Sequence, residues 1–390
     1  MTTIQQNSTT TSDITWGGAD NGQATTTSAR RELYLKLFSG EMFKGFQRNT
    51  IARDLVTKRT LKNGKSLQFI YTGRTKSEFH VPGNSILGNS DGAPPVAQKT
   101  ITCDDLLISS AFVYELDETL AHYDLRGEIS RKIGYALAEN YDRRIFRAIT
   151  KAARKASPVT KANYVEPGGT QIRVGLNAKA SDAYVPASLV DAFYEAAAVL
   201  DEKGVSSDGR VAVLNPRQYY ELVQDVSTAS LINRDEQGDA RQSGKGVYEI
   251  AGIKIFKSMN IPFFGKFGTS LGGGDDATNP NVADDPRKGS FVGEAMGDQH
   301  ASDTPSGQRT VNDYGQQAKF NNSCGLIFQK EAAGVVEAIG PQVQVTSGDI
   351  SVVYQGDVIL GRLAMGADYL NPACAVELYA GTGTAPTAFG

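Results

Sequence analysis

Hydrophobic and polar residues alternate along residues 51–79 in the pattern typical of β-strands, most clearly around Phe69. The dipeptide Asn63-Gly64 within this stretch favours a tight turn, because both residue types accept positive φ at little cost. The stretch has too few apolar positions for a core of its own. We therefore expect residues 55–98 to project as a long two-stranded arm.

A different pattern predicts an unusually long helix over about residues 118–156, roughly 55 Å at the α-helical rise. Its apolar residues recur every four positions, and a strict step of four drifts by about 40° each time. The apolar stripe therefore winds around the helix, and we expect it to meet different neighbours along its length. The stripe consists of Leu125, Ile129, Ile133, Leu137, Tyr141, Ile145 and Ile149.

The remaining patterns complete a mixed α+β fold. An amphipathic helix, a buried strand and a helix that starts at Pro216 follow a connector over 157–185, and Pro is favoured at a first helical position. The segment 351–362 fits either a strand or a helix. We expect five divisions of the chain. The first two are an N-terminal arm over 1–54, with a polar tail 1–29 and a helix 30–46, and the hairpin arm 55–98. The others are a region 99–185 with a strand at about 99–116 and the long helix, an α/β unit 186–340 with surface loops over 265–320, and closing strands with a tail over 341–390.

Composition limits the function further. The chain has 390 residues and a formal charge of -3, which argues against a protein whose main task is to bind nucleic acid phosphates. The sequence contains no run of about 18 apolar residues, so no membrane-spanning helix is expected. The N-terminus lacks the features of a secretory signal. Cys103, Cys324 and Cys374 are far apart and odd in number, so we expect buried free thiols.

Candidate chemistry is sparse. The three histidines have no ligand or nucleophile at a useful spacing, and the glycine-rich stretch 272–274 lacks the ending of a phosphate-binding loop. We therefore expect no catalytic, cofactor or metal residues. A lysine–asparagine cross-link between Lys62 or Lys65 and Asn371 would need a carboxylate and a dry pocket, so turn and surface roles are favoured. The basic residues of the long helix are expected to pair with acidic neighbours.

The residues also carry a resemblance. The sequences Leu35-Lys36-Leu37-Phe38-Ser39-Gly40-Glu41, Gly64-Lys65-Ser66-Leu67-Gln68-Phe69, Ile101-Thr102-Cys103-Asp104-Asp105-Leu106-Leu107 and His122-Tyr123-Asp124-Leu125-Arg126, with Gly73-Arg74-Thr75, Pro82-Gly83 and Ala364-Met365-Gly366, resemble major capsid proteins of tailed phages, in particular short-tailed phages related to T-seven. The resemblance is specific over about 35–155 and looser over 210–380.

This resemblance implies the Hong Kong 97-type capsid fold. Residues 55–98 would be the extended loop laid across a neighbouring subunit, 118–156 the spine helix of the peripheral domain, and 186–340 the axial domain. It implies an icosahedral head of several hundred copies in the virion, built in the host cytoplasm on a scaffolding protein with a portal, with a possible decoration protein, and enclosing double-stranded DNA. Contacts between subunits are expected at Trp16, Asn63, Gly64, Lys65, Phe69, Arg74, Arg126, Arg131, Arg143 and Arg144.

Three other classes are open to test. A cargo-enclosing nanocompartment protein of the encapsulin type shares the fold, an α/β enzyme fits the mixed composition, and an adhesin or fibre domain fits a structural role. The absence of nucleophile, metal and cofactor motifs is unfavourable to the enzyme. The long helix and the lack of repeats are unfavourable to the fibre. Particles of icosahedral form that contain DNA would separate the virus from the nanocompartment.

Overall fold

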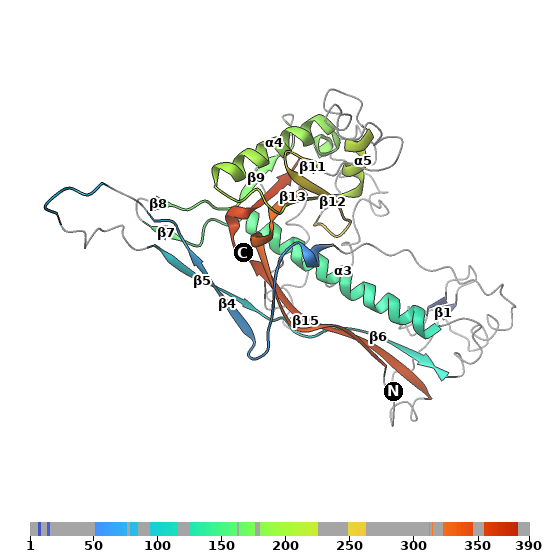
Figure 1. Ribbon diagram of the computed structural model, residues 1–390. Helices are drawn as coiled ribbons and strands as arrows, with labels where there is room; N and C mark the ends of the chain where they lie inside the picture. Colours follow the sequence, from blue (N-terminus) through green and yellow to red (C-terminus); the bar gives the residue numbers. More distant parts are fainter. Residues whose placement is uncertain are drawn as a thin grey trace. The chain divides into compact units, whose positions relative to one another are not determined.

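The computed structural model describes residues 7–8, 14–15, 51–75, 79–84, 94–115, 125–161, 164–175, 180–224, 249–262, 312, 314, 323–345 and 355–380. The chain divides into two compact units. Unit 1 comprises Met1–Arg48, Leu106–Glu139 and Ile339–Ala364, and unit 2 comprises Asn49–Asp105, Asn140–Ala338 and Met365–Gly390. The helix α3 (Leu125–Ala153) and the strands β14 (Ala333–Val345) and β15 (Gly356–Tyr369) each contribute residues to both units. Figure 1 labels α3 and β15 on the ribbon.

Unit 1 pairs a strand ladder with the first half of the long helix. Strand β6 (Leu107–Tyr114) is antiparallel to the start of β15, from Gly356 opposite Tyr114 to Leu363 opposite Leu107. Gly361 lies against α3, where an added Cβ would be 2.8 Å from Leu137 Cδ1. Close packing of strand and helix therefore requires glycine here.

Unit 2 is built on a six-stranded mixed sheet of order β11-β12-β10-β13-β16-β9. The parallel pair β10 and β12 is connected through α5, as a parallel pairing requires a crossover. The elements are β9 (Thr170–Arg173), α4 (Pro186–Glu202), β10 (Arg210–Leu214), α5 (Pro216–Gln224), β11 (Glu249–Ile250), β12 (Ile253–Lys257), β13 (Ser323–Gln329) and β16 (Ala375–Tyr379), with the short helices η2 (Ala180–Tyr184), η7 (Lys330–Ala332) and η8 (Pro372–Cys374).

The hydrophobic core of unit 2 lies between this sheet and the two helices that cover it. Leu189, Phe193 and Leu200 of α4 are fully buried in one cluster with residues of the sheet, such as Ile327 and Val376. The spacing of four and seven residues on α4 is that of an amphipathic helix, so the sequence pattern and the packing agree. The apolar run 211–214 of β10 is buried, as its sequence predicts, and Arg210 before it is buried as well and pairs with Asp201.

The predicted arm is observed as a hairpin of β4 (Ser66–Thr72) and β5 (Val96–Thr102), with Leu67 opposite Ile101. The strand before it, β3 (Thr57–Thr60), does not join this hairpin but pairs in parallel with β14. The single strand expected over 99–116 is wrong, because β5 ends at Thr102 and β6 begins at Leu107. At this break the chain changes partners, and the Asp104 N–H donates to the Met365 carbonyl at 3.1 Å.

Other expectations meet different outcomes. The long helix ends at Ala153, three residues before the predicted end, where the Gly169 N–H binds the Lys155 carbonyl. The ambiguous segment 351–362 is strand from Gly356 onward, and the connector 157–185 contains β7 (Thr160–Lys161), β8 (Tyr164–Val165) and the sheet strand β9. The helix predicted over 30–46 lies outside the described residues. So does the tail 1–29, apart from the paired strands β1 (Asn7–Ser8) and β2 (Ile14–Thr15).

Candidate assembly surface

The β4–β5 hairpin has two different faces. Leu67, Phe69 and Tyr71 alternate on a half-buried face, which confirms the strand pattern seen in the sequence. On the opposite face Ile70 is 75% exposed, and Val96 at the end of the ladder is 62% exposed. The predicted contact residue Phe69 therefore lies on the inner face, whereas the open face carries apolar side chains that the sequence analysis did not select.

Asn63, Gly64 and Lys65 form the exposed corner between β3 and β4. Gly64 has a φ of 90°, as the turn pattern predicts. The Lys65 carbonyl accepts a hydrogen bond from the Cys103 N–H at 2.8 Å, so this corner lies at the root of the hairpin and not at its tip. The alternation of residues identified the turn, but the turn's place depends on which strands pair.

Arg74 lies two residues after Thr72, the outer end of β4. Its backbone N–H donates to the buried carboxylate of Glu166, and its guanidinium donates to the Lys203 carbonyl after α4. Arg74 Nε also lies 3.8 Å from Glu166 Oε2. All of these partners belong to the same subunit as Arg74. Because the Arg74 side chain is half exposed, part of it also faces solvent.

The arginines predicted on the long helix fall into two groups. Arg131 is exposed and pairs with Glu128 one turn away. Arg143 and Arg144 are buried in unit 2, and Arg144 Nη1 lies 3.4 Å from Asp104 Oδ2. The expectation that the helix's basic residues pair with acidic neighbours is confirmed for Arg131 and Arg144, and also for Lys151 and Arg154. Of Arg126 only the place in the helix backbone is described, and Trp16 lies outside the described residues.

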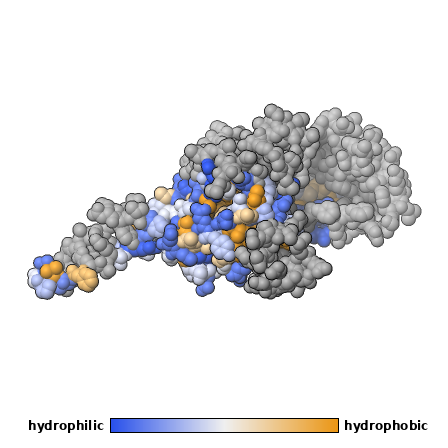
Figure 2. All heavy atoms as spheres, turned by 90° about the horizontal axis from the view of Figure 1, so that it is seen from above, coloured by the Kyte–Doolittle hydropathy of each residue, from blue (hydrophilic) through white to orange (hydrophobic). Residues whose placement is uncertain are grey.

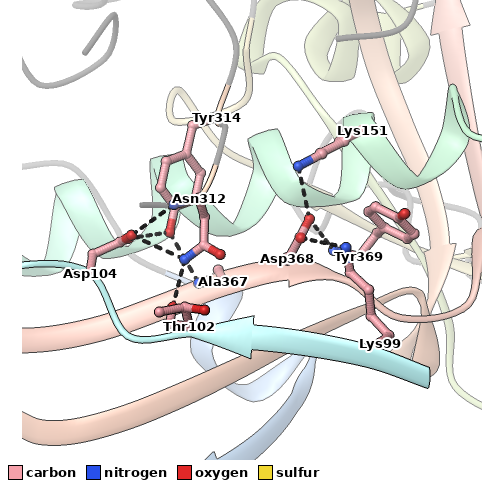
Figure 3. Close-up of polar contacts among 9 residues, drawn as sticks. All are labelled: Lys99, Thr102, Asp104, Lys151, Asn312, Tyr314, Ala367, Asp368 and Tyr369. Carbon is pink, nitrogen blue, oxygen red and sulfur yellow. Dashed lines mark hydrogen bonds and ion pairs between the residues drawn. The ribbon is translucent and has the colours of Figure 1, made fainter. Parts of the chain in front are cut away.

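Asp104 is the centre of a buried polar cluster at the root of the hairpin (Figure 3). Its Oδ1 accepts from the backbone N–H and the side-chain amide of Asn312, at 3.1 and 3.0 Å. Its Oδ2 accepts from the Tyr314 hydroxyl at 2.5 Å, and that hydroxyl accepts from the Ala367 N–H at 3.0 Å. Burial, and then the charge of Asp104, raise the pKa of Tyr314, so the phenol stays protonated as the donor.

This cluster corrects one part of the sequence analysis. Residues 265–320 were expected to be surface loops, yet Asn312 and Tyr314 are buried. Nothing local distinguishes these two residues from the polar sequence around them. Their partners are about 200 positions earlier in the chain, so no pattern within 265–320 could have indicated the contact.

A second carboxylate holds the hairpin at Lys99, five residues before Asp104 in the chain. Asp368 of β15 binds Lys99 of β5 at 2.7 Å and Lys151 of α3 at 3.1 Å (Figure 3). Lys99 Nζ also lies 3.8 Å from the ring centroid of Tyr369, within the range of a cation–π interaction. The base of the hairpin is therefore fixed to β15 and to α3 by charges that are mostly buried.

Surface-exposed apolar residues are the clearest feature that the sequence analysis missed. Beyond the β4–β5 ladder, Phe79 is fully exposed and Val81 is 59% exposed. Elsewhere, the described surface in Figure 2 is a mosaic of hydrophilic and hydrophobic residues on the face in view. The signal available in the sequence was the run Phe69-Ile70-Tyr71, in which Ile70 interrupts the alternation of polar and apolar positions.

The described residues show little reactive chemistry. All three cysteines are free and buried, as expected, and burial raises the pKa of Cys374 to about 12. A thiol with such a pKa is a poor nucleophile at neutral pH. Asn371 caps the short helix η8 by accepting from the Ala373 N–H at 3.1 Å, which is a turn role. No group of ligand residues in the described part could hold a metal ion, and none of its helices is long and apolar enough to cross a membrane.

The sequence and the fold are similar to those of known phage capsid proteins. The major capsid protein of Escherichia phage T7 is 24% identical over 347 residues, which are 88% of this chain and 90% of that protein. That of Enterobacteria phage T3 is 30% identical over 123 residues, 31% of this chain and 35% of that protein. The capsid structure of the cyanophage P-SCSP1u is similar with a TM-score of 0.69 and 30% identity, and covers 94% of this chain and 98% of that chain.

The mature capsid of bacteriophage PhiM1 has a TM-score of 0.61 at 17% identity, over 88% of this chain and 91% of that chain, and supports the fold. Residues 68–303 match the family described as Gp10A-like major capsid protein. The relatives are phage capsid proteins, not encapsulins or enzymes. The fold is of the Hong Kong 97 type, and the role is structural, in the shell of the virion. The chain therefore belongs to the Gp10A-like family of major capsid proteins, in the form that T7-like podophages use for their heads.

Proposed function

We propose that the β4–β5 hairpin and the segment beyond it are the surface by which one capsid subunit holds the next. The observation that supports this most is the apolar exposure at Ile70, Val96, Phe79 and Val81. Exposed apolar side chains on an otherwise polar projection are typical of a contact surface. In a shell, burial of these residues against a second copy would add stability that the isolated subunit lacks.

The experiment compares two substitutions on the open face of β4. Ile70→Asn removes an exposed apolar side chain, and Gln68→Asn leaves the same amide on the same face without that loss. We expect Ile70→Asn to reduce the yield of closed shells, seen by sedimentation and electron microscopy, while thermal unfolding of the unassembled subunit is unchanged. Equal shell yields from the two variants would contradict the proposed contact.

The other predicted contact residues enter the proposal according to their exposure. Asn63, Gly64, Lys65 and Arg131 are exposed and available to a neighbouring subunit. Arg74 is half exposed and can reach a neighbour with the side that faces solvent. Arg143 and Arg144 are buried in their own subunit, and we propose that they act on assembly only by supporting the root of the hairpin. The proposed places of Trp16, Phe69 and Arg126 in the interface rest on the resemblance alone.

We propose the domain roles as follows. The six-stranded sheet with α4 and α5 is the axial domain, and it includes β9 and β16, which the sequence analysis placed outside 186–340. The first half of α3 with β6 and β15 is the peripheral domain. Hydrogen–deuterium exchange on closed shells would test this, because the axial and peripheral elements should be protected by different neighbours.

We further propose assembly with a scaffolding protein and a portal, a head that encloses double-stranded DNA without catalysis, and room for a decoration protein. The support on this chain is electrostatic. Arg144, Lys151 and Arg154 are directed into buried ion pairs, so these cations are not offered to phosphates. Co-expression with and without each candidate partner, followed by electron microscopy, tests these roles. Strong, salt-dependent DNA binding by the isolated subunit would contradict the passive wall.

A further inference from the structure

The β4–β5 hairpin is attached to the rest of unit 2 at both of its ends. At its root, Lys99, Thr102 and Asp104 bind β15, α3 and the buried residue Asn312. At its outer end, Arg74 binds Glu166, as described above. A projection held only at its base could swing as a whole, whereas this one is fixed again at the far end of its ladder.

The outer attachment involves three segments of unit 2. Glu166 follows β8 and its side chain is only 3% exposed, with the Arg74 N–H and guanidinium as partners. The same guanidinium donates to the carbonyl of Lys203, just after the end of α4. Lys203 Nζ in turn donates to the Gly168 carbonyl at 2.7 Å and to the Thr170 hydroxyl. Arg74 thus connects the hairpin to β8 and to α4 at once.

The packing around Gly73 shows how closely these groups fit. Its N–H donates to the Pro95 carbonyl across the hairpin at 2.8 Å. A Cβ at this position would lie 2.8 Å from Pro95 Cγ and 2.9 Å from Glu166 Oε1. Any residue larger than glycine would therefore push the carboxylate or the proline away. The close approach of Glu166 to the Arg74 N–H depends on this missing side chain.

The two attachments differ in how accessible they are to water. The carboxylates are buried at both attachments, since the side chains of Asp104, Asp368 and Glu166 are 0%, 8% and 3% exposed. The cations differ, because Arg144 is 7% and Lys99 is 21% exposed, whereas Arg74 is 53% exposed. Water can solvate the exposed guanidinium of Arg74 when it leaves the pair, which lowers the cost of opening on the arginine side. The buried pairs cannot exchange partners for water without a large loss. The outer attachment is therefore the one that opens first.

We propose that Arg74, Glu166 and Lys203 form a releasable latch, which sets the direction of the hairpin's outer half and which, when it opens, frees the hairpin beyond Lys99. The latch acts within one subunit. It does not depend on which surface of a neighbour the hairpin contacts. The latch can therefore be disproved while the proposed contact surface is supported, and the contact surface can be disproved while the latch is supported.

Double electron–electron resonance, which measures the distance between two spin labels, tests the latch directly. Spin labels are attached to Val96→Cys, at the outer end of β5, and Tyr194→Cys, on the exposed side of α4. The labelled full-length protein is mixed with an excess of unlabelled protein, so that the distances measured fall within one subunit. The native cysteines are buried, and protein without the added cysteines checks that they take no label.

We expect a narrow distance distribution that becomes about twofold wider in Arg74→Ala and in Gly73→Ala, because each variant opens the same local contact. The double variant should be no wider than the singles. Arg217→Ala is the control, since it removes a partly exposed arginine from the pair with Glu221 and does not change a residue of the hairpin.

Unchanged widths in Arg74→Ala, or equal widening in the control, would overturn the latch. Arg74→Ala decides the matter even if Gly73→Ala fails to fold, because it shortens a half-exposed side chain and opens no cavity in the core. Circular dichroism of each variant verifies that the fold is retained. Shell yield is recorded separately and reports on the contact surface.

Discussion

Arg154 and Glu377 form a bidentate ion pair in the interior of unit 2, with Nε to Oε2 at 2.7 Å and Nη2 to Oε1 at 2.6 Å. Both side chains are at most 1% exposed. The Ser323 hydroxyl donates to the same carboxylate at 2.5 Å, and Gln171 donates at 2.9 Å. The end of α3 is thereby tied to three strands of the sheet, and every group in the cluster depends on the others.

Removal of this carboxylate should destabilise the subunit strongly. We expect Glu377→Ala to lower the free energy of unfolding by about 3–5 kcal/mol, because it leaves the arginine buried and unpaired. Urea unfolding of the purified, unassembled subunit measures the loss. The control, Glu221→Gln in a more exposed pair with Arg217, should stay within about 0.5 kcal/mol. A comparable stability for the two variants would show that water relieves the buried charge.

The buried hydroxyl of Tyr314 should contribute measurably to the stability of the subunit. Tyr314→Phe removes the donor to Asp104 and the acceptor of the Ala367 N–H, both of which are buried. We expect a loss of about 1–3 kcal/mol, since two buried polar groups are left without this partner. Tyr220→Phe is the control, because that hydroxyl binds Lys257 at an exposed site. Similar unfolding midpoints for the two variants would argue against the buried cluster.

The stability of the corner at Gly64 should depend on the backbone conformation that the residue can adopt and not on the size of its side chain. An added Cβ meets nothing within 4 Å, but the φ of 90° strains any other residue. We expect Gly64→Val to cost about 1–3 kcal/mol and to reduce shell yield more than subunit folding. Gly340→Val is the comparison, because that glycine also has open space and does not adopt positive φ. Normal yields of shells from Gly64→Val would refute this role of the corner.

Lys203 should make stability depend on pH in the alkaline range. Burial lowers its pKa to about 8 in the folded subunit, below the value of the unfolded chain. Between these two pKa values the unfolded state binds more protons, so stability should rise as pH increases above about 8 and fall again as pH is lowered.

The measurement compares urea midpoints of the unassembled subunit at mildly and strongly alkaline pH. Lys203→Met should abolish the gain relative to the original protein, while Lys254→Met, which alters an exposed lysine of β12, should retain it. The difference between variants cancels the contribution of other groups that titrate in this range. A gain of the same size in both variants would rule out Lys203 as its source.

The sequence by itself determined the elements whose signals are local. The alternation around Phe69 identified a strand, Pro216 marked the start of α5, and apolar residues four apart identified α3. The winding stripe on α3 also gave a correct expectation of several neighbours, since Leu137 lies by Gly361 in unit 1 and the Tyr141 hydroxyl binds Glu337 at 2.6 Å in unit 2. These signals depend on the chain's own periodicity, so they survive without any knowledge of partners.

Only the tertiary structure decided which distant segments meet. Strand β3 reads as part of the arm, yet it pairs with β14 nearly 280 positions later, and this moves the Gly64 corner to the root. The burial of Tyr314 depends on Asp104, and the exposure of Ile70 depends on which face of the hairpin packs inward. Backbone pairing, burial and ion pairing between remote residues are properties of the assembled fold, and no local pattern carries them.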